Sequence, residues 1–412
     1  MSDGLEPALV GSPLPVPASL VANAATHTML DSIYPYVEQK IHQDIRRSSA
    51  GSLTVLVRGL YLRPPQAEPA DSEMPQKQFN WHRPTTTTPA RPHDGGADTI
   101  ILNCFPSLAY VQHYAGLVAT YLSLTGRDRA AAAAAVRYSP PALRQCITPF
   151  LASNLRDMGR ADIVVVGYAY RLPRLLQTGE QAWITGRKDW EQEEDGQGRG
   201  GGNLFAWQKR TLPGGRTVTY LECAASMWGD ASGHLVRALR ALNGVRCVLY
   251  VGKAGSLRPT DTPNELLATG RRSYLDDGEN GRDQAVVEWD NVLAAASRRS
   301  GKAVLEGDIV TVASPLGESA AWLARWQPRC SWVDCEVGYM ALAAQEGGTD
   351  FGYLHIVSDN VACCGKETLA NEDGDHIQQR RNALFGDVED ILEGFFDDYA
   401  KSAPTERVVP GP

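Results

Sequence analysis

Short apolar runs that alternate with helical segments constrain the fold of this chain most strongly. Ile163-Val-Val-Val166 shows no polar alternation, as expected for a strand whose two faces are both covered by helices. Further strands are predicted at 246–251, 304–313 and 353–358, and helices at 230–242, 317–326, 334–346 and 376–400. Strands that alternate with helices favour a layered sheet. We therefore predict an α/β fold, a three-layer α/β/α sandwich with a mixed central sheet.

The composition limits the class of partner. The chain has 412 residues, of which 43% are hydrophobic and 21% charged, as in soluble globular proteins. Its net charge is −8 and it has no basic block, which argues against a nucleic-acid partner. No run approaches about 18 apolar residues, so no membrane span is expected, and Met1 to His27 does not have the pattern of a signal peptide.

The cysteines indicate a cytoplasmic protein without a metal centre. Cys104, Cys146 and Cys247 lie in apolar segments, which is typical of reduced, buried thiols. Cys363 and Cys364 are adjacent and lack the C-x-x-C spacing of zinc or redox sites. We expect no metal and no cofactor.

Composition along the chain predicts four parts. Residues 1–98 are expected to be an irregular N-terminal region with a Pro/Thr-rich linker, although 29–47 is predicted as a helix and 53–59 as a strand. Residues 99–160 are expected to form a strand-helix extension that packs on the core, with the strand at 99–104. The main domain, which resembles one family as described below, is predicted at 161–400, and a polar, Gly-rich insertion interrupts it at 186–203. Residues 401–412 are predicted to be a disordered tail.

Two carboxylates lie on consecutive predicted elements. Glu336 ends the segment Ser331-Trp-Val-Asp-Cys-Glu336 and lies in the first turn of the helix predicted at 334–346, and Asp359 lies at the carboxyl end of the next strand. Ligands of open α/β sheets bind where strands end, and paired carboxylates suit a reaction that builds positive charge on a sugar. Two other interpretations stay open: an acidic residue favoured by the helix dipole for Glu336, and a plain turn for Asp359 and Asn360.

These segments resemble the purine nucleoside phosphorylase and methylthioadenosine nucleosidase superfamily, whose "V-(E/D)-M-E" and "(I/V)-S-D" motifs they approach. Three other segments resemble that family in the same chain order: Ser226-Met-Trp-Gly-Asp-Ala-Ser232, Val251-Gly-Lys-Ala-Gly-Ser-Leu257 and Glu306-Gly-Asp-Ile-Val310. They are similar to its "(S/T)-G-(I/M)-G-x-x-(S/A)" turn, its "G-(T/S)-A-G-G-L" loop and its "G-D-x-(F/V)" segment. The resemblance covers residues 161–400 and implies a nucleoside phosphorylase-like fold.

The resemblance also implies roles for particular residues. Asp359 would protonate the departing base and Glu336 would bind the ribose. The implied substrate-binding residues are Trp228, Gly229, Gly252, Lys253, Gly255, Val310, Cys335 and Ser358. Trp228 is also interpretable as a core residue, and Lys253 as a solvated residue of a turn.

The sequence departs from the family at three positions and lacks one motif. Cys335 stands where Met is usual, Lys253 where phosphorylases carry Ser or Thr, and Tyr250 where some carry a phosphate-binding Arg. We find no "G-D-P-x-R" motif, so hydrolysis and phosphorolysis both stay open, and Lys253 is the candidate phosphate partner.

The implied activity is cleavage of the N-glycosidic bond of a purine nucleoside or related compound, with Asp359 favouring a 6-amino purine. Expected partners are a small nucleoside-like substrate, phosphate as a candidate co-substrate, and a second copy of the chain as a candidate homo-oligomer. Two alternatives remain: the same scaffold recruited for another transfer or condensation in specialised metabolism, and a non-catalytic nucleoside-binding module.

Overall fold

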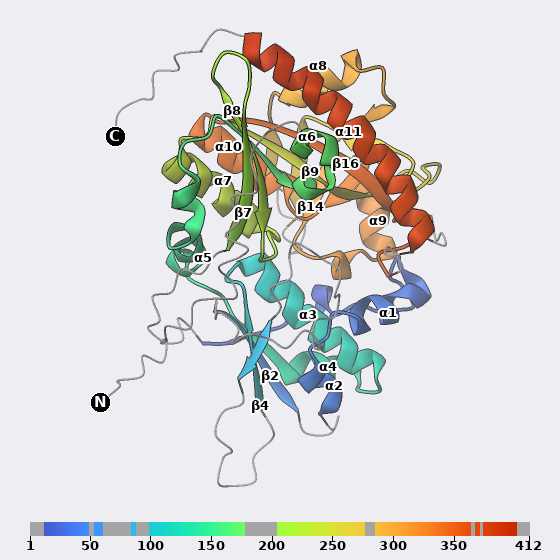
Figure 1. Ribbon diagram of the computed structural model, residues 1–412. Coiled ribbons are helices and arrows are strands. Elements are labelled where there is room, and N and C mark those ends of the chain that lie inside the picture. Colours follow the sequence, from blue (N-terminus) through green and yellow to red (C-terminus); the bar gives the residue numbers. More distant parts are fainter. Residues whose placement is uncertain are drawn as a thin grey trace, which may run out of the picture.

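Two β-sheets organise the described part of the chain. The computed structural model describes residues 12–48, 53–60, 84–87, 99–177, 204–276, 285–363, 367–370 and 374–401. The insertion predicted at 186–203 and the tail from residue 402 lie outside these ranges. The larger sheet lies in the upper half of Figure 1 and the smaller one, built from N-terminal residues, in the lower half.

The larger sheet is mixed and has eleven described strands. They are β6 (Ile163–Gly167), β7 (Phe205–Thr211), β8 (Thr217–Cys223), β9 (Cys247–Ser256), β10 (Leu267–Thr269), β11 (Arg272–Asp276), β12 (Val286–Glu288), β13 (Val304–Glu306), β14 (Ile309–Val312), β15 (Trp332–Asp334) and β16 (Asp350–Asn360). The two longest, β9 and β16, run parallel to each other, and β6 is the other parallel neighbour of β9. Near its carboxyl end β9 also pairs with β15, in antiparallel orientation.

Helices cover both faces of this sheet. Ile163 and Val165 of β6 belong to a hydrophobic cluster with α6 (Pro173–Gln177), α8 (Val292–Arg299) and α11 (Asp375–Lys401). The alternate residues Val164 and Val166 belong to the cluster of α7 (Asp230–Asn243) and α10 (Val337–Gly347). Successive side chains of a strand point to opposite faces, so an all-apolar strand requires cover on both. The predicted three-layer α/β/α sandwich with a mixed central sheet is confirmed.

The smaller sheet corrects the expected division of the N-terminal half. Its strand order is β1-β5-β2-β4-β3, and the strands are β1 (Leu14–Pro15), β2 (Thr54–Gly59), β3 (Thr85–Thr87), β4 (Thr99–Cys104) and β5 (Val136–Ser139). β4 pairs with β2 and β3, so the sheet joins residues on both sides of the boundary predicted at 98. The described residues between 14 and 139 therefore form one unit, which we call the N-terminal unit, in place of the irregular region and the extension that we expected.

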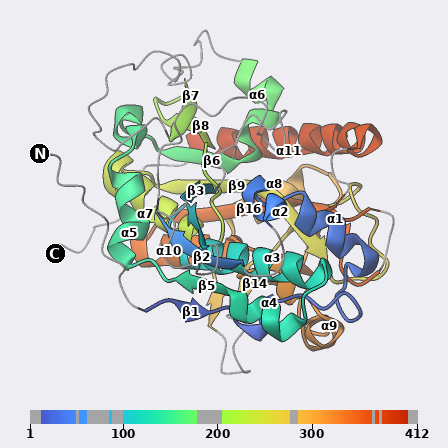
Figure 2. The ribbon, with the colours of Figure 1, turned by 90° about the horizontal axis from the view of Figure 1, so that it is seen from below.

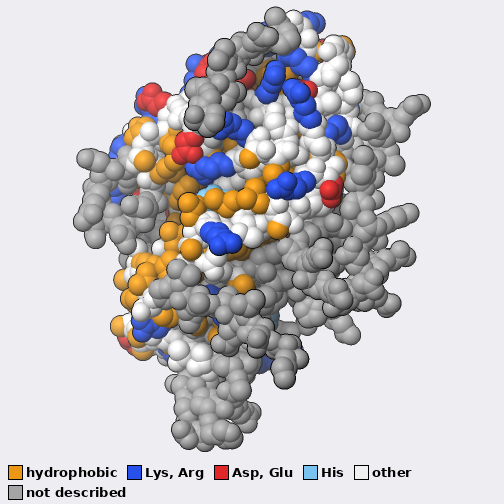
Figure 3. All heavy atoms as spheres, turned by 90° about the vertical axis from the view of Figure 1, so that its left-hand side faces the viewer, with side chains coloured by type: hydrophobic (Ala, Val, Ile, Leu, Met, Phe, Trp, Pro, Cys, Tyr) orange, Lys and Arg blue, Asp and Glu red, His pale blue; other side chains and the backbone are white. Residues whose placement is uncertain are grey.

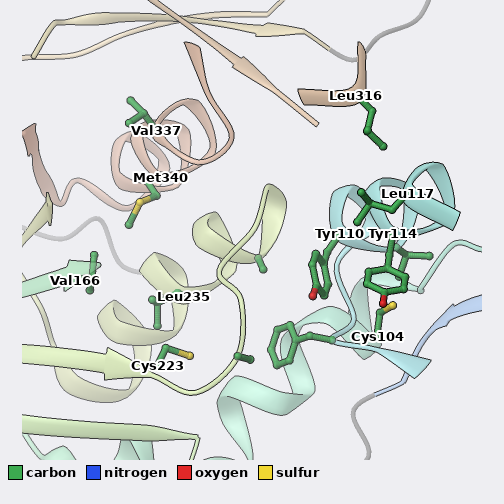
Figure 4. Packing of buried hydrophobic residues seen from close by; sticks show 14 of the residues in the cluster. Cys104, Tyr110, Tyr114, Leu117, Val166, Cys223, Leu235, Leu316, Val337 and Met340 are labelled. Atoms are coloured by element: carbon green, nitrogen blue, oxygen red, sulfur yellow. The ribbon is translucent and has the colours of Figure 1, made fainter. Parts of the chain in front are cut away.

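Four α-helices belong to the described part of the N-terminal unit: α1 (Ile33–Glu38), α2 (Gln43–Arg47), α3 (Leu108–Leu124) and α4 (Arg129–Ala135). One of them, α3, contacts both β2 of the smaller sheet and α7, which covers the larger sheet. Figure 2 shows α3 beside α4, and α11 on the other side of β9 and β16 from both of them. Tyr110 and Leu117 of α3 share one buried cluster with Leu235 of α7, Met340 of α10 and Leu316 (Figure 4). The two units thus have a common core.

Several predicted elements are broken or longer than expected. The helix predicted at 29–47 is replaced by a short 3-10 turn, Leu30–Ser32, followed by α1 and α2. The strand predicted at 304–313 is two strands, β13 and β14, which pair with different neighbours on either side of Gly307 and Asp308. β5 was not predicted, because the alanine run before it favours a helix through residue 135.

Three cysteines that were expected to be buried thiols lie in the core. Cys104, Cys146 and Cys247 are buried, as predicted.

Basic and apolar side chains are interspersed on one face of the molecule. Figure 3 views this face, which carries α5 (Leu143–Leu151) and α7. Leu143 and Leu151 of α5 are among the exposed large hydrophobic residues. None of the described helices has the length and hydropathy needed to cross a membrane.

Candidate functional site

Glu336 stands at the start of α10, but a different carboxylate caps this helix. Asp334 Oδ2 accepts hydrogen bonds from the amides of Glu336, at 3.1 Å, and Val337, at 2.7 Å. Thr311 Oγ1 donates to Asp334 Oδ1 at 2.7 Å and fixes its orientation. A carboxylate that accepts the first free amides of a helix stabilises its N-terminus. Asp334 fills the structural role that was one interpretation of Glu336, so the Glu336 side chain is not needed for it.

The Glu336 carboxylate faces Tyr250, which lies inside β9. The Tyr250 hydroxyl donates to Glu336 Oε2 at 3.3 Å. Burial raises the pKa of Glu336, and the neighbouring Asp334 carboxylate raises it further. The Cys335 amide, the Tyr250 hydroxyl and the Lys253 ammonium oppose this shift and favour the ionised form. Glu336 is therefore a partly buried acid whose charge depends on a few nearby donors.

Gly252 is explained by the packing of a buried histidine. A Cβ added at Gly252 would lie 2.8 Å from His355 Nε2. The His355 ring packs edge-to-face on Tyr250, with ring centroids 5.2 Å apart. Burial lowers the pKa of His355 to about 3, so the ring is neutral at physiological pH. The glycine thus makes room for His355, which supports the Tyr250 ring beside Glu336.

Asp359 owes its position to an irregularity in β16. Val357 pairs with Ala254 of β9, but the next pair is Asp359 with Gly255, so Ser358 is an extra residue. Such a β-bulge re-aims the side chains that follow it, and bulges are frequent beside active sites. Without it, Ser358 would stand opposite Gly255. The bulge places the carboxylate there instead.

The surroundings of Asp359 are buried but polar. Ser358 Oγ donates to Asp359 Oδ1 at 2.7 Å. A Cβ at Gly255 would lie 3.3 Å from Asp359 Oδ2 and 2.7 Å from a methyl group of Val361. A larger residue at 255 would displace these neighbours. Gly255 thus leaves the space that the Asp359 carboxylate uses.

The segment from Gly252 to Ser256 is a strand, which corrects the loop expected there. These residues continue β9 and pair with β16 as far as Ser256 with Asn360. Their amides therefore take part in a sheet rather than in an anion-binding loop. Lys253 is half-buried in this strand instead of solvated on a turn, and its ammonium lies 6.0 Å from the centre of the Tyr168 ring.

Trp228 and Gly229 contact the N-terminal unit. The Trp228 ring stacks on His113 of α3 with centroids 4.3 Å apart, and its Nε1 donates to the Ala313 carbonyl at 2.8 Å. Gly229 has φ +59°, and a Cβ there would lie 2.2 Å from the Ala109 Cβ. The close approach that requires this glycine is made by α3, so the expectation of a ligand-facing turn is not needed to explain it.

Val310 is the second residue of β14, and Cys335 directly follows β15. Val310 is fully buried in a cluster with Leu257, Trp326 and Val333, which is a core position. Cys335 is partly exposed, and burial, then the charges of Glu336, Asp334 and Glu318, raise its pKa. Cys335 therefore lies within electrostatic reach of both Glu336 and Glu318.

Glu318 is a candidate residue that sequence patterns did not single out. It follows the 3-10 turn Pro315–Gly317 and is 3% exposed. Burial raises its pKa, and the charge of Asp359 raises it further. In the sequence, Glu318 precedes Ser319, which caps α9 (Ala320–Trp326), so it is indistinguishable from an ordinary residue at a helix start.

One cluster could hold a cation in principle. Ligand atoms of Cys146, Asp230 and His234 lie within 4.8 Å of one another. Asp230, however, already accepts hydrogen bonds from Ser107 Oγ and from the amides of Leu108 and Ala109 at the start of α3. Its carboxylate is accounted for as the cap of α3.

No protein-family model matches the sequence, and no curated protein matches it either. Solved structures do resemble it. A Weissella paramesenteroides protein described as a methylthioadenosine nucleosidase has 16% identity and a TM-score of 0.43, with 58% of this chain and 98% of that chain covered. Futalosine hydrolase of Helicobacter pylori has 15% identity and a TM-score of 0.40 over 58% and 98%. The 5'-methylthioadenosine/S-adenosylhomocysteine nucleosidase of Neisseria meningitidis has 16% identity and a TM-score of 0.41 over 58% and 99%.

Proposed function

We propose that this protein cleaves the N-glycosidic bond of a purine nucleoside or a related compound. Asp359 is the general acid that protonates the departing base, and Glu336 binds the hydroxyl groups of the sugar. The observation that carries this proposal is the β-bulge at Ser358, which puts the Asp359 carboxylate opposite Gly255 at the carboxyl end of the two longest strands. Ligands of open α/β sheets bind at this edge.

The proposed roles of Asp359 and Glu336 follow from the charges that develop when the glycosidic bond breaks. When the bond between the anomeric carbon and the base nitrogen breaks, positive charge develops on the sugar and negative charge on the base. A proton from Asp359 neutralises the base. An ionised Glu336 strengthens its hydrogen bonds to the sugar hydroxyls as the positive charge grows, which stabilises the transition state more than the ground state.

Tyr250 and Lys253 tune Glu336 for this role. Both favour the ionised form of a carboxylate that burial otherwise keeps protonated. In hydrolysis, water then adds its oxygen to the anomeric carbon and releases one proton, which restores the acid. In phosphorolysis, a phosphate oxygen takes the place of water, and Lys253 is the candidate partner of that phosphate.

A substrate screen tests the proposal. Adenosine, methylthioadenosine and guanosine are each incubated with the protein, with and without phosphate, and free base is measured. We expect release of adenine, because a carboxylic acid at position 359 suits a 6-amino purine. A requirement for phosphate identifies phosphorolysis. Failure to release base from all three nucleosides under both conditions contradicts the proposal.

A further inference from the structure

Asn264 is a buried residue with an unusual backbone conformation. It lies between β9 and β10, is 1% exposed and has a φ of +61°. Among the described residues other than glycine, only Leu30 also has a positive φ. This left-handed conformation disfavours most side chains, although asparagine tolerates it better than others. A buried residue that keeps this conformation is held in it by its surroundings.

Both the backbone and the side chain of Asn264 contact the β-bulge of β16. The Asn264 amide donates to the Val357 carbonyl at 2.6 Å, and Asn264 Nδ2 donates to the Ser358 carbonyl at 3.2 Å. The extra residue of a bulge is left out of the ladder, so its buried polar groups need partners from elsewhere. Ser358 is this extra residue, and it is 4% exposed. Asn264 therefore supplies a donor to the bulge residue and a donor to the residue before it.

The residues just before β10 take the place of a strand beside the bulge. The Leu266 carbonyl accepts from the Val357 amide at 3.0 Å, and Asn264 supplies the two donors that follow. On its other edge β16 pairs with β9, where Asp359 stands opposite Gly255. Partners that hold consecutive carbonyl groups on one edge of a strand fix which residue is extra. They thereby fix which residue faces Gly255 on the other edge.

Three groups fix the orientation of the Asn264 side chain. Arg381 of α11, which is 5% exposed, donates from Nε to Asn264 Oδ1 at 2.6 Å. Asn264 Nδ2 donates to Glu367 Oε2 at 2.8 Å as well as to the Ser358 carbonyl. Glu367 in turn pairs with Arg380. The oxygen of the amide thus meets a donor and its nitrogen meets two acceptors, a combination that a carboxylate cannot satisfy.

We propose that Asn264 is a positioning residue for Asp359: its amide group holds the bulge that sets the Asp359 carboxylate opposite Gly255. This inference rests on the proposed function. Asn264 acts through the backbone of residues 357 and 358 rather than on the base or the sugar. A displacement of about 1 Å in a reacting group can cost about 100-fold in rate. A defect in the bulge should therefore lower turnover while the nucleoside still binds.

Asn264→Asp tests this role with a side chain of the same size. The introduced carboxylate keeps an acceptor for Arg381 and tolerates the positive φ, but it offers no donor to the Ser358 carbonyl. We expect kcat for release of base from methylthioadenosine to fall about 10- to 100-fold with little change in KM. Asn382→Asp is the matched control and should keep both constants, because Asn382 is an exposed residue of α11 whose Oδ1 accepts from Arg171.

Asn264→Gly keeps the inference testable if the introduced carboxylate prevents folding. Glycine adopts a positive φ without strain and retains the backbone amide that donates to Val357, so only the side chain is lost. We expect the same pattern in this variant, a lower kcat with little change in KM. Circular dichroism at the assay temperature shows that each variant is folded.

A crystal structure of Asn264→Gly tests the bulge without any activity. We expect the Asp359 carboxylate to move from its place opposite Gly255 by about 1 Å or more. An Asp359 carboxylate that stays in its wild-type position overturns the inference, whether or not nucleosides are cleaved. A displaced Asp359 in a variant that keeps the wild-type kcat, or in a protein that cleaves no nucleoside, contradicts the proposed function alone.

Discussion

The two units of this protein differ in what they contribute to the candidate site. The main sheet supplies Asp359 and Glu336, which stand at or just beyond strand ends. Among its described residues, the N-terminal unit supplies no carboxylate that we assign to chemistry, but its contacts hold Trp228, Gly229 and residues 313–320. One unit therefore carries the reacting groups, and the other fixes the backbone around them. A residue can therefore owe its position to a distant part of the chain, as Ser314 does to His113, 201 positions away.

The strongest test of the main sheet's role is Asp359→Asn. The amide is isosteric but cannot deliver a carboxylic proton, so turnover should fall by about 100- to 10,000-fold. Base release at saturating nucleoside measures it, with circular dichroism to show that the fold is intact. Asp157→Asn, at an exposed position, is the control. Full turnover by the Asp359→Asn variant would leave Asp359 without an acid role.

The strongest test of the N-terminal unit's role is Gly229→Ala. The new methyl group would collide with Ala109 and would also be strained at φ +59°, so we expect a loss of about 2–4 kcal/mol in the free energy of unfolding. Gly244→Ala is the matched control, because its φ is +63° and a Cβ there meets open space. It should cost only about 1 kcal/mol. Urea titration distinguishes the two, and equal losses would show that α3 does not constrain this turn.

The two units also differ in how many of their strands, helices and site residues could be predicted from the sequence. Ile163–Val166 and helix 376–400 were predictable because burial on two faces and a long helix leave strong local patterns. In the N-terminal unit, the strands at 53–59 and 99–104 were predicted, but their pairing into one sheet was not, because a long segment separates them in the sequence. Gly252 and Gly229 were assigned to a ligand, but His355 and Ala109 explain them, and such packing has no local signature. The burial of Glu318 has no local signature either, because it depends on packing against residues far away in the sequence.

Lys253→Met tests whether the Lys253 ammonium influences the ionisation of Glu336 in the main sheet. Loss of the ammonium removes a group that favours the ionised form of Glu336, so the pKa of Glu336 should rise and the acidic limb of kcat/KM should move to higher pH. If the reaction is phosphorolysis, the KM for phosphate should also rise about tenfold or more, as expected for loss of a charge-assisted hydrogen bond. Steady-state kinetics over a pH range measures both. An unchanged acidic limb would show that Lys253 does not act on Glu336.

A smaller effect is expected where the two units meet at His113. Its replacement by Ala removes the stacking on Trp228 and the contact with Ser314, which together are worth about 1–3 kcal/mol. We therefore expect a lower free energy of unfolding, because Trp228 and Ser314 each lose a contact to α3. His376→Ala, at an exposed position on α11, is the control. Urea titration measures both variants, and equal stabilities would show that His113 does not join the two units.

The most direct test of the central claim, that Glu336 and Asp359 act on one ligand, is a crystal structure of Asp359→Asn with methylthioadenosine. This variant should bind the nucleoside without cleaving it. The account predicts a purine ring nitrogen within about 3.2 Å of the amide introduced at position 359 and sugar hydroxyls within about 3.2 Å of the Glu336 carboxylate. A nucleoside bound elsewhere, or one that reaches only one of the two side chains, would contradict it.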